Sequence, residues 1–423
     1  MNKSLIASII AAGLCVSTGV AAENIAIVNG KVHTMTSTGT LEKATILIEN
    51  DKIVKVGKDV TVSGDYRVID AKGKVVTPGF IGAFTSLGLM EVPSYGSGVD
   101  ANAGKANISA ALDASYAITP DTSLRDITRI EGFTSVASAV SQTATIFKGQ
   151  GAIVTLGNDQ TPVTKARAFM VVDVSESGAS KAGGSRAALW VELRDALKQA
   201  QYAQNIRFTP QTEWHGLPVA DVQALVPVVK GDMPLLVIAH RATDIRQVIA
   251  LQEEFSALNI TLVGAAEGWR VADEIGKAGF SVILNPESNL PYSFEQNAST
   301  LANAGRLNEA GVNVAIGINT HNIRLAAQNA GNAVANGMPY QAGLASLTSS
   351  VAKIYGLEES HGSLKAGMTA DVVVWSGDPL EVMHAPTNVI INGEEVKLES
   401  RQTKLRDRYL SLTSDKPVQY TRP

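Results

Sequence analysis

The sequence predicts an α/β fold, a (β/α)8 barrel of the TIM type with a small β-sandwich formed by both terminal segments. Two observations support it. Apolar and polar residues alternate with a period of two near both ends of the chain. Between the ends, short and almost entirely apolar runs alternate with amphipathic segments of helical period. We therefore expect a signal peptide over 1–22, a composite β-sandwich from 23–77 plus 366–423, and a barrel over 78–365.

The first 22 residues have the pattern of a secretory signal. Lys3 precedes an apolar run from Leu5 to about Val20, and Ala21 and Ala22 follow it. The alternative is a membrane anchor, but Ser, Gly and Thr interrupt the run, which is short for a span that needs roughly 20 apolar residues. We expect cleavage after Ala22 and an exported, periplasmic protein with no membrane span after cleavage.

Composition narrows the class of protein. Cys15, the only cysteine, lies inside the expected signal, so we expect a mature chain without disulfides or thiolate metal ligands. The chain is 45% hydrophobic and 18% charged, with a formal net charge of −4. It has no run of Lys and Arg, which argues against nucleic acid as a partner. These values are typical of a globular enzyme.

Both ends of the chain read as antiparallel β-structure. From 24 to 77, alternating runs flank turn candidates at Asn50-Asp51 and Lys72-Gly73. Near the other end, "ADVVVWSGDPL" is followed by "NVIINGEEVKL", with a turn at Asn392-Gly393. Two half-sheets so far apart in the sequence indicate one small β domain completed by both termini.

The middle of the chain predicts about eight βα units. The strand candidates are "FIGAFTS", "FTSVASA", "AIVTLG", "AFMVVDV", "PLLVIAH", "ITLVGAA", "FSVILNP" and "VNVAIGIN". Helix candidates include 185–203 and 244–258, the second with Asp244 as its N-cap. Alternation of this kind favours parallel strands closed into a barrel. The alternative, an open doubly wound sheet, needs a glycine-rich phosphate turn whose spacing "GFIGAFTSLG" lacks.

The stretch from 91 to 123 is rich in Gly, Ser and Ala and follows the first barrel strand. Loops at that place build the active face of such barrels, and a loop of this length is often a lid or a binding loop. A surface excursion without a function explains it equally well.

Four segments carry a resemblance to a known family: "AKGKVVTPGFIGAF", "EGFTSV", "AIGINTH" and "SSVAKIYGLEESHGSLKAGMTADVVVWSGDPL". With these, the chain resembles the amidohydrolase superfamily, and within it the imidazolonepropionase-like branch. The resemblance implies a hydrolase barrel beside a composite β-sandwich. It also implies hydrolysis of a C–N or similar bond by water bound to one or two divalent ions, usually zinc.

Most metal-ligand positions implied by the resemblance are substituted. Phe84 and Ser86 stand where the family has His-x-His on the first strand, and Asn319 stands where the eighth strand has an aspartate. The sixth strand offers Glu267 in place of its histidine, which leaves His240, on the fifth strand, as the only matching ligand. A catalytic zinc normally takes three protein ligands. We therefore expect no cofactor, with zinc or another divalent metal only if the family chemistry survives.

Alternative roles remain open for these side chains. His240 fits a hydrogen-bonded histidine at the barrel mouth better than a metal ligand. A replacement site built from His240, Glu267, Asn319 and His321 is a second possibility, since functional groups gather at the C-terminal ends of barrel strands. Phe84 and Ser86 should point into the mouth and favour an uncharged ligand. Further aromatic and histidine side chains are explained by packing, by loops or by the terminal sheet: Trp269, Tyr95, His33, His215, His361 and His384.

Two functions follow from these patterns. The first is an exported hydrolase of the amidohydrolase type that acts on a C–N bond of a small cyclic amide or peptide-like compound, with a reduced metal site. The second is a non-catalytic binding or subunit paralogue that pairs with an intact relative. For partners we expect a small-molecule ligand or substrate and a homo-oligomer or a hetero-oligomer with such a paralogue.

Overall fold

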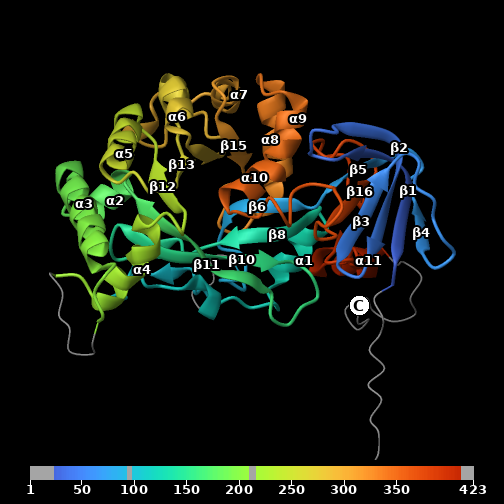
Figure 1. Ribbon diagram of the computed structural model, residues 1–423, viewed down its shortest axis with the longest axis horizontal. Coiled ribbons are helices and arrows are strands. Elements are labelled where there is room, and N and C mark those ends of the chain that lie inside the picture. Colours follow the sequence, from blue (N-terminus) through green and yellow to red (C-terminus); the bar gives the residue numbers. More distant parts are fainter. Residues whose placement is uncertain (1–22, 93–97, 209–215, 411–423) are drawn as a thin grey trace, which may run out of the picture.

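The computed structural model in Figure 1 describes residues 23–92, 98–208 and 216–410. It has an α/β fold in which an eight-stranded sheet, surrounded by helices, lies beside a second eight-stranded sheet at one end of the molecule. The expected signal peptide falls outside the described residues. No helix within the described ranges is long and apolar enough to cross a membrane.

The first of these sheets is nearly closed into a barrel. Its strands follow the order β15-β14-β13-β12-β11-β10-β8-β6. The two edge strands approach each other through Phe84, whose N–H donates to the Gly317 carbonyl at 3.0 Å and whose carbonyl accepts from the N–H of Asn319 at 3.1 Å. The bounds are β6 Phe80–Thr85, β8 Phe133–Ser138, β10 Phe147–Thr155, β11 Val163–Asp173, β12 Leu235–Ala239, β13 Ile260–Gly264, β14 Ser281–Leu284 and β15 Asn313–Ile316.

All eight predicted strand segments form strands of this sheet, but the prediction that all run parallel is wrong for one of them. β10 runs antiparallel to both β8 and β11. A crossover helix is needed only between parallel neighbours, and the links on either side of β10 have none. The regular alternation of strand and helix therefore breaks between residues 133 and 173.

The barrel interior is filled by apolar side chains from every strand. They include Ile81 and Ala83 of β6, Ile153 of β10, and Leu236 of β12. The short helix α10 (Ser349–Ile354) and the Tyr355 that follows it pack against the same cluster. The hydroxyl of Tyr355, which is fully buried, donates to the Ala83 carbonyl. The interior is thus a packed core, and functional groups of such barrels gather at the rim.

Helices cover the outside of the barrel, where the alternate strand residues pack against them (Figure 1). Asp244 was predicted as an N-cap, but α5 begins at Ala242 and Asp244 lies inside its first turn. The longer helices are α3 Arg186–Ala203, α4 Val219–Val229, α5 Ala242–Glu254, α8 Ala326–Ala335 and α11 Arg401–Leu410, and the shorter ones are α1 Ser123–Arg129, α2 Glu176–Lys181, α6 Ala272–Ala278, α7 Asn303–Glu309 and α9 Tyr340–Ala345.

The terminal segments form the second sheet together, in the order β18-β17-β16-β5-β1-β2-β3, with β4 also paired to β1. All of its strands belong to one hydrogen-bonded sheet, and both ends of the chain contribute to its apolar core. The bounds are β1 Ile25–His33, β2 Thr40–Glu49, β3 Lys52–Gly57, β4 Arg67–Asp70, β5 Val75–Pro78, β16 Val372–Trp375, β17 Pro386–Ile391 and β18 Glu394–Glu395.

The predicted turns in this sheet have two outcomes. Asn50 and Asn392 adopt the positive φ expected of tight hairpin turns, and the strands on either side of each pair antiparallel. Lys72-Gly73 also forms a turn, but β4 and β5 do not pair with each other. Both run parallel to β1 instead, so the expectation of a fully antiparallel sheet is wrong at this point.

The long segment after β6 is anchored to the helical layer. Between residues 98 and 123 it contains β7 (Asn102–Ala103) and the single turn η1 (Ala114–Tyr116). The buried carboxylate of Asp221, on α4, accepts hydrogen bonds from the N–H groups of Ser109, at 3.0 Å, and Ala111, at 2.7 Å. This part of the segment is therefore tied to α4.

Candidate functional site

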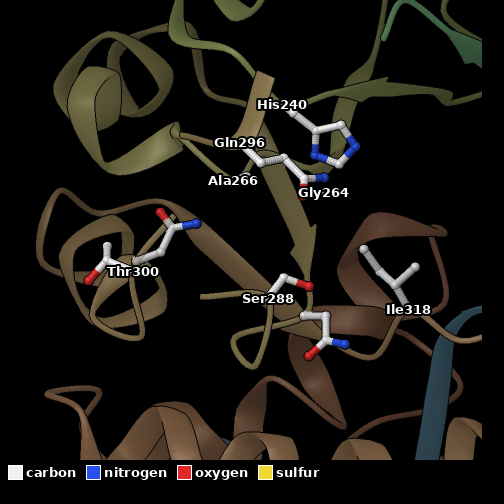
Figure 2. Close-up of a pocket in the computed structure, with 9 residues that line it drawn as sticks. His240, Gly264, Ala266, Ser288, Gln296, Thr300 and Ile318 are labelled. Carbon is white, nitrogen blue, oxygen red and sulfur yellow. The ribbon is translucent and has the colours of Figure 1, made fainter. Parts of the chain in front are cut away.

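A small cavity lies at the end of β12, β13 and β14, where the C-terminal ends of parallel strands meet. Figure 2 shows the side chains around it. Its volume is about 150 Å³. It is lined by His240, Gly264, Ala266, Asn285, Ser288, Gln296, Thr300, Asn303 and Ile318. Because functional groups of such barrels gather at this rim, the cavity is the candidate site.

His240 follows directly after β12, and its imidazole lies over the backbone of Gly264. A Cβ atom at residue 264 would lie 2.4 Å from the ring, and residue 264 has a φ of +92°, so the position requires glycine. Burial lowers the pKa of His240, and the nearby carboxylates of Glu295, Asp173 and Asp244 offset this only in part. The ring is therefore held as neutral imidazole, and its buried Nδ1 has no hydrogen-bond partner among the described residues.

The two first-strand residues have different surroundings. Phe84 is partly buried and, like Ile238 and Ile318, packs against the apolar barrel interior. Ser86 is buried, and its hydroxyl donates to the carbonyl of Ala139 at 2.7 Å. The ring of Phe84 thus lies at the rim, while the hydroxyl of Ser86 is bound to the backbone directly after β8.

Asn319 and His321 belong to a local turn after β15. The carboxamide oxygen of Asn319 accepts from the N–H of His321 at 3.1 Å and from that of Asn322 at 2.8 Å. The Nδ1 of His321 lies 2.9 Å from the hydroxyl of Thr320. Asn319 therefore acts as a turn-forming residue, and its oxygen is already saturated by backbone donors.

Glu267 is buried after β13 and serves the helix beside it. Its Oε2 accepts from the N–H of Ala242 at 3.1 Å, at the N-terminus of α5, and lies 3.6 Å from Nη1 of Arg270. A carboxylate at a helix N-terminus satisfies a free N–H group and interacts favourably with the helix dipole. Its backbone N–H also donates to the His240 carbonyl at 2.9 Å.

The predicted site residues thus form two groups that are each joined through the backbone. One contains Phe84, Ser86, Asn319 and His321, where β6 meets the end of β15, and the other contains His240 and Glu267. Ile318 connects them, because it forms a β-bridge with Phe84 and also lines the His240 cavity.

The other side chains singled out in the sequence have local partners or lie outside the described residues. The indole N–H of Trp269 donates to the Ala298 carbonyl at 2.7 Å. His33, His361 and His384 each contact a neighbouring polar group through Nδ1. Tyr95 and His215 fall in the two internal segments that are not described.

Sequence reasoning missed a buried ionic network behind the cavity. Arg186, at the start of α3, donates to Asp244 at 3.0 Å and to Glu295 at 2.6 Å. Arg241 also pairs with Asp244, at 2.8 Å, and Lys148 lies 3.4 Å from the buried Asp173. Apart from Arg241 and Asp244, which are three residues apart, the members are distant in the sequence, so no local motif reveals the network. The one sequence signal was Asp173, a carboxylate directly at the end of a predicted buried strand.

The loop between β14 and α7 was also missed. It supplies Ser288, Gln296 and Thr300 to the cavity wall, and its single turn η3 (Phe294–Gln296) is anchored through Glu295. Besides Arg186, Glu295 accepts from the N–H of Glu176 at 2.8 Å. These contacts anchor the residue that precedes Gln296 and so hold this part of the loop at the cavity.

The donor set at the rim does not match a metal site of the expected kind. Within the described residues, no three His, Cys, Asp or Glu side chains are grouped so that they could hold one ion. Among the predicted site residues, His240 has the one buried imidazole nitrogen without a partner in the described part of the chain. Its nearest carboxylates are paired with Arg or Lys.

Comparison with known sequences gives matches over parts of the chain. Residues 257–397 match the family model described as "Amidohydrolase family". A 5-methylthioadenosine/S-adenosylhomocysteine deaminase from Thermococcus sibiricus is 65% identical over 43 residues, which are 10% of this chain and 10% of that protein. The chain spans only about a tenth or less of the length of the curated relatives that it matches.

Comparison with solved structures extends the likeness to most of the chain. An amidohydrolase from Thermotoga maritima superimposes with a TM-score of 0.77 at 24% identity, covering 88% of this chain and 99% of that one. A mutant atrazine chlorohydrolase from Arthrobacter aurescens, solved with zinc and atraton, gives a TM-score of 0.50 at 15% identity, with 90% and 98% covered. The chain thus matches the amidohydrolase family in sequence over residues 257–397 and shares the fold of solved amidohydrolases over most of its length.

Proposed function

We propose that this chain is an amidohydrolase-fold protein that binds a small molecule at the barrel mouth, with metal-dependent hydrolysis of C–N bonds degenerate or lost. The observation that carries the proposal is the state of the expected ligand positions. Phe84 cannot coordinate a metal, the hydroxyl of Ser86 donates to Ala139, and the oxygen of Asn319 accepts two backbone N–H groups.

A catalytic zinc needs about three protein ligands with one position left open for water. Here His240 offers one nitrogen, and a single imidazole cannot supply the binding free energy of roughly 10 kcal/mol or more that structural zinc sites reach. Asn319 also cannot replace an aspartate as general base, because a carboxamide does not accept a proton near neutral pH. The residues therefore do not fit the metal centre.

A metal-dependent hydrolase remains the second candidate. The amidohydrolase match over 257–397 favours it, as does the survival of His240 at the end of β12. The curated relatives include proteins named as deaminases, and one structural neighbour was solved with zinc. On this reading the chain acts on a C–N bond of a small cyclic or peptide-like compound and uses an unusual set of ligands.

Calorimetric titration of the purified chain with Zn²⁺ separates the two. The proposal predicts no saturable uptake that depends on His240, so the chain and its His240→Ala variant should give the same weak heats. Stoichiometric uptake that is lost in His240→Ala supports the hydrolase instead.

We make two further proposals, one on the location of the chain and one on its assembly. From the pattern of residues 1–22 we propose export to the periplasm with cleavage after Ala22, which N-terminal sequencing of the exported protein tests directly. We also propose that the chain assembles as a homo-oligomer or pairs with an intact paralogue. Isolation of the tagged chain at native expression level, followed by mass determination of the complex, tests this; a monomer would contradict it.

A further inference from the structure

A second cavity lies where the barrel meets the terminal sheet, and its volume is about 210 Å³. Glu131 lines it from the link between α1 and β8, at the amino end of that strand and so at the opposite end of the barrel from the His240 rim. Arg324 lines it from the single turn η4 (Ile323–Leu325), which precedes α8, and the loop between β16 and β17 forms another part of the wall. The two cavities share no lining residue.

Two opposite charges line this second cavity but do not pair with each other. Neither Glu131 nor Arg324 makes an ion pair or a side-chain hydrogen bond with any described residue, and the Nε of Arg324 is buried without a partner. Burial raises the pKa of Glu131, and the charge of Arg324 offsets this only in part. Leaving such groups without partners is costly, so both side chains are available to a ligand that carries complementary groups.

The charges around the cavity select against a ligand with a single charge. The exposed Glu381 lines it together with Glu131, whereas Arg324 is the one Lys or Arg residue among its described lining residues. A simple anion attracted by Arg324 would be repelled by the two carboxylates, and a simple cation attracted by the carboxylates would be repelled by Arg324. A molecule with one carboxylate and one ammonium group avoids both penalties. The planar guanidinium suits the carboxylate end, which it can bind through two parallel hydrogen bonds.

The remaining wall is largely apolar, and its lining includes Leu325, Trp375, Leu380 and Val382. The ring of Trp375 packs against the backbone of Gly132, where a Cβ atom would lie 2.5 Å from it, and the indole N–H donates to Thr77 at 2.9 Å. Gly132 directly follows Glu131, so the same packing anchors the backbone that carries the carboxylate. A wall held in this way loses little conformational entropy when a ligand arrives, which favours binding.

We propose that this cavity binds an α-amino acid with an apolar side chain, whose carboxylate pairs with Arg324 and whose ammonium group pairs with Glu131. A volume of about 210 Å³ equals that of about seven water molecules at roughly 30 Å³ each, which suits a ligand of this size. The apolar side chain lies against Leu325 and Leu380, where it is removed from water. The site is separate from the His240 rim, so the inference does not rest on the proposed function.

Four compounds test the proposal: leucine, 4-methylpentanoate, which lacks the ammonium group, 3-methylbutylamine, which lacks the carboxylate, and glycine, which lacks the apolar side chain. Each is titrated into the purified chain, labelled with ¹⁵N in its arginine side chains. The Nε–H resonance of Arg324, assigned by its loss in Arg324→Lys, is followed by NMR. Leucine should shift it in a saturable way with a Kd of roughly 0.1–1 mM, as expected for a ligand of few atoms. The other three should bind at least about 10-fold more weakly, because each lacks a charged hydrogen bond or the apolar burial.

Glu131→Gln removes the partner of the ammonium group and should weaken leucine binding about 10-fold. Glu253→Gln, at an exposed position on α5, is the matched control and should leave leucine binding unchanged. Circular dichroism establishes that both variants are folded. The proposal is overturned if leucine gives no saturable shift, if any of the other three compounds binds as tightly as leucine, or if Glu131→Gln binds leucine as the unaltered chain does.

Discussion

The carboxylate of Glu267 accepts a hydrogen bond from the backbone N–H of Ala242 across 3.1 Å, which joins the end of β13 to the first residue of α5. Arg241, the residue before that helix, offers no capping bond of its own. A carboxylate placed at the sixth strand end of the barrel thus has a structural task. Substitution of a helix cap lowers the stability of the fold, whereas substitution of a catalytic group lowers activity, so variants of Glu267 distinguish the two roles.

Glu267→Ala should destabilise the fold by about 1–2 kcal/mol, the usual cost of removing a helix N-terminal cap. Glu267→Gln keeps an oxygen that can accept from Ala242 and should recover most of the loss. Chemical denaturation of the three proteins measures this. If both variants were as stable as the unaltered chain, Glu267 would be free for another role at the rim.

The buried His240 should make stability depend on pH. Its folded pKa is lowered by burial despite the nearby carboxylates of Asp173, Asp244 and Glu295, whereas the unfolded value is about 6.5. Below about pH 6.5 the unfolded chain binds a proton that the folded chain does not, so stability falls as the pH falls, by up to about 1.4 kcal/mol per unit. The test is to measure the free energy of unfolding of the unaltered chain and of His240→Asn at pH 7 and at pH 5.

The Asn variant lacks this titration, so its stability should fall less over the same range. His33 also has a lowered pKa and is present in both proteins, so its contribution cancels in the comparison. Equal losses in the two proteins would show that His240 is solvated or paired in the folded state.

The Glu295–Arg186 pair should hold the β14–α7 loop over the cavity. Glu295→Gln removes one charge from an ion pair whose glutamate is buried, so the free energy of unfolding should fall by about 1–3 kcal/mol. The loss stays in this range because Arg186 is partly exposed and still pairs with Asp244. Hydrogen exchange should rise specifically in residues 285–302. Glu274→Gln, in an exposed ion pair with Arg246, is the control and should change stability little. Unchanged exchange in the loop would contradict the anchoring role.

Placing imidazoles at the end of β6 should give the chain metal affinity. Phe84→His with Ser86→His provides, with His240, the three nitrogen ligands that zinc sites commonly need. Zinc retained through dialysis should rise in the double variant and stay low in Phe84→His alone. No increase in a double variant that remains folded would mean that these positions do not face His240, or that Asn319 and the sixth strand are equally limiting.

The sequence was informative where a local pattern determines structure. The eight buried strands, the Asn50 and Asn392 turns and the participation of both chain ends in one sheet all follow from periodicity and turn chemistry. The direction of β10 could not be predicted, because the apolar pattern of a strand buried on both faces is the same whether the strand runs parallel or antiparallel. β4 and β5 were assigned to each other since they are adjacent in sequence, yet both pair with β1.

The site was harder to predict than the fold. His240 could be placed at the rim because it directly follows an apolar strand. Gln296 could not be placed there, since it lies in a loop anchored by the ion pair between Glu295 and Arg186, which are 109 positions apart in the sequence. Likewise, no sequence pattern shows that the hydroxyl of Ser86 is used by Ala139.

Elemental analysis of the purified protein, after dialysis against metal-free buffer, tests the central claim most directly. The claim is that the rim presents Phe84, Ser86 and Asn319 where metal ligands would be required. It predicts zinc, iron and manganese each far below one equivalent per chain. One equivalent of any of them, retained through dialysis and lost in His240→Ala, would contradict it.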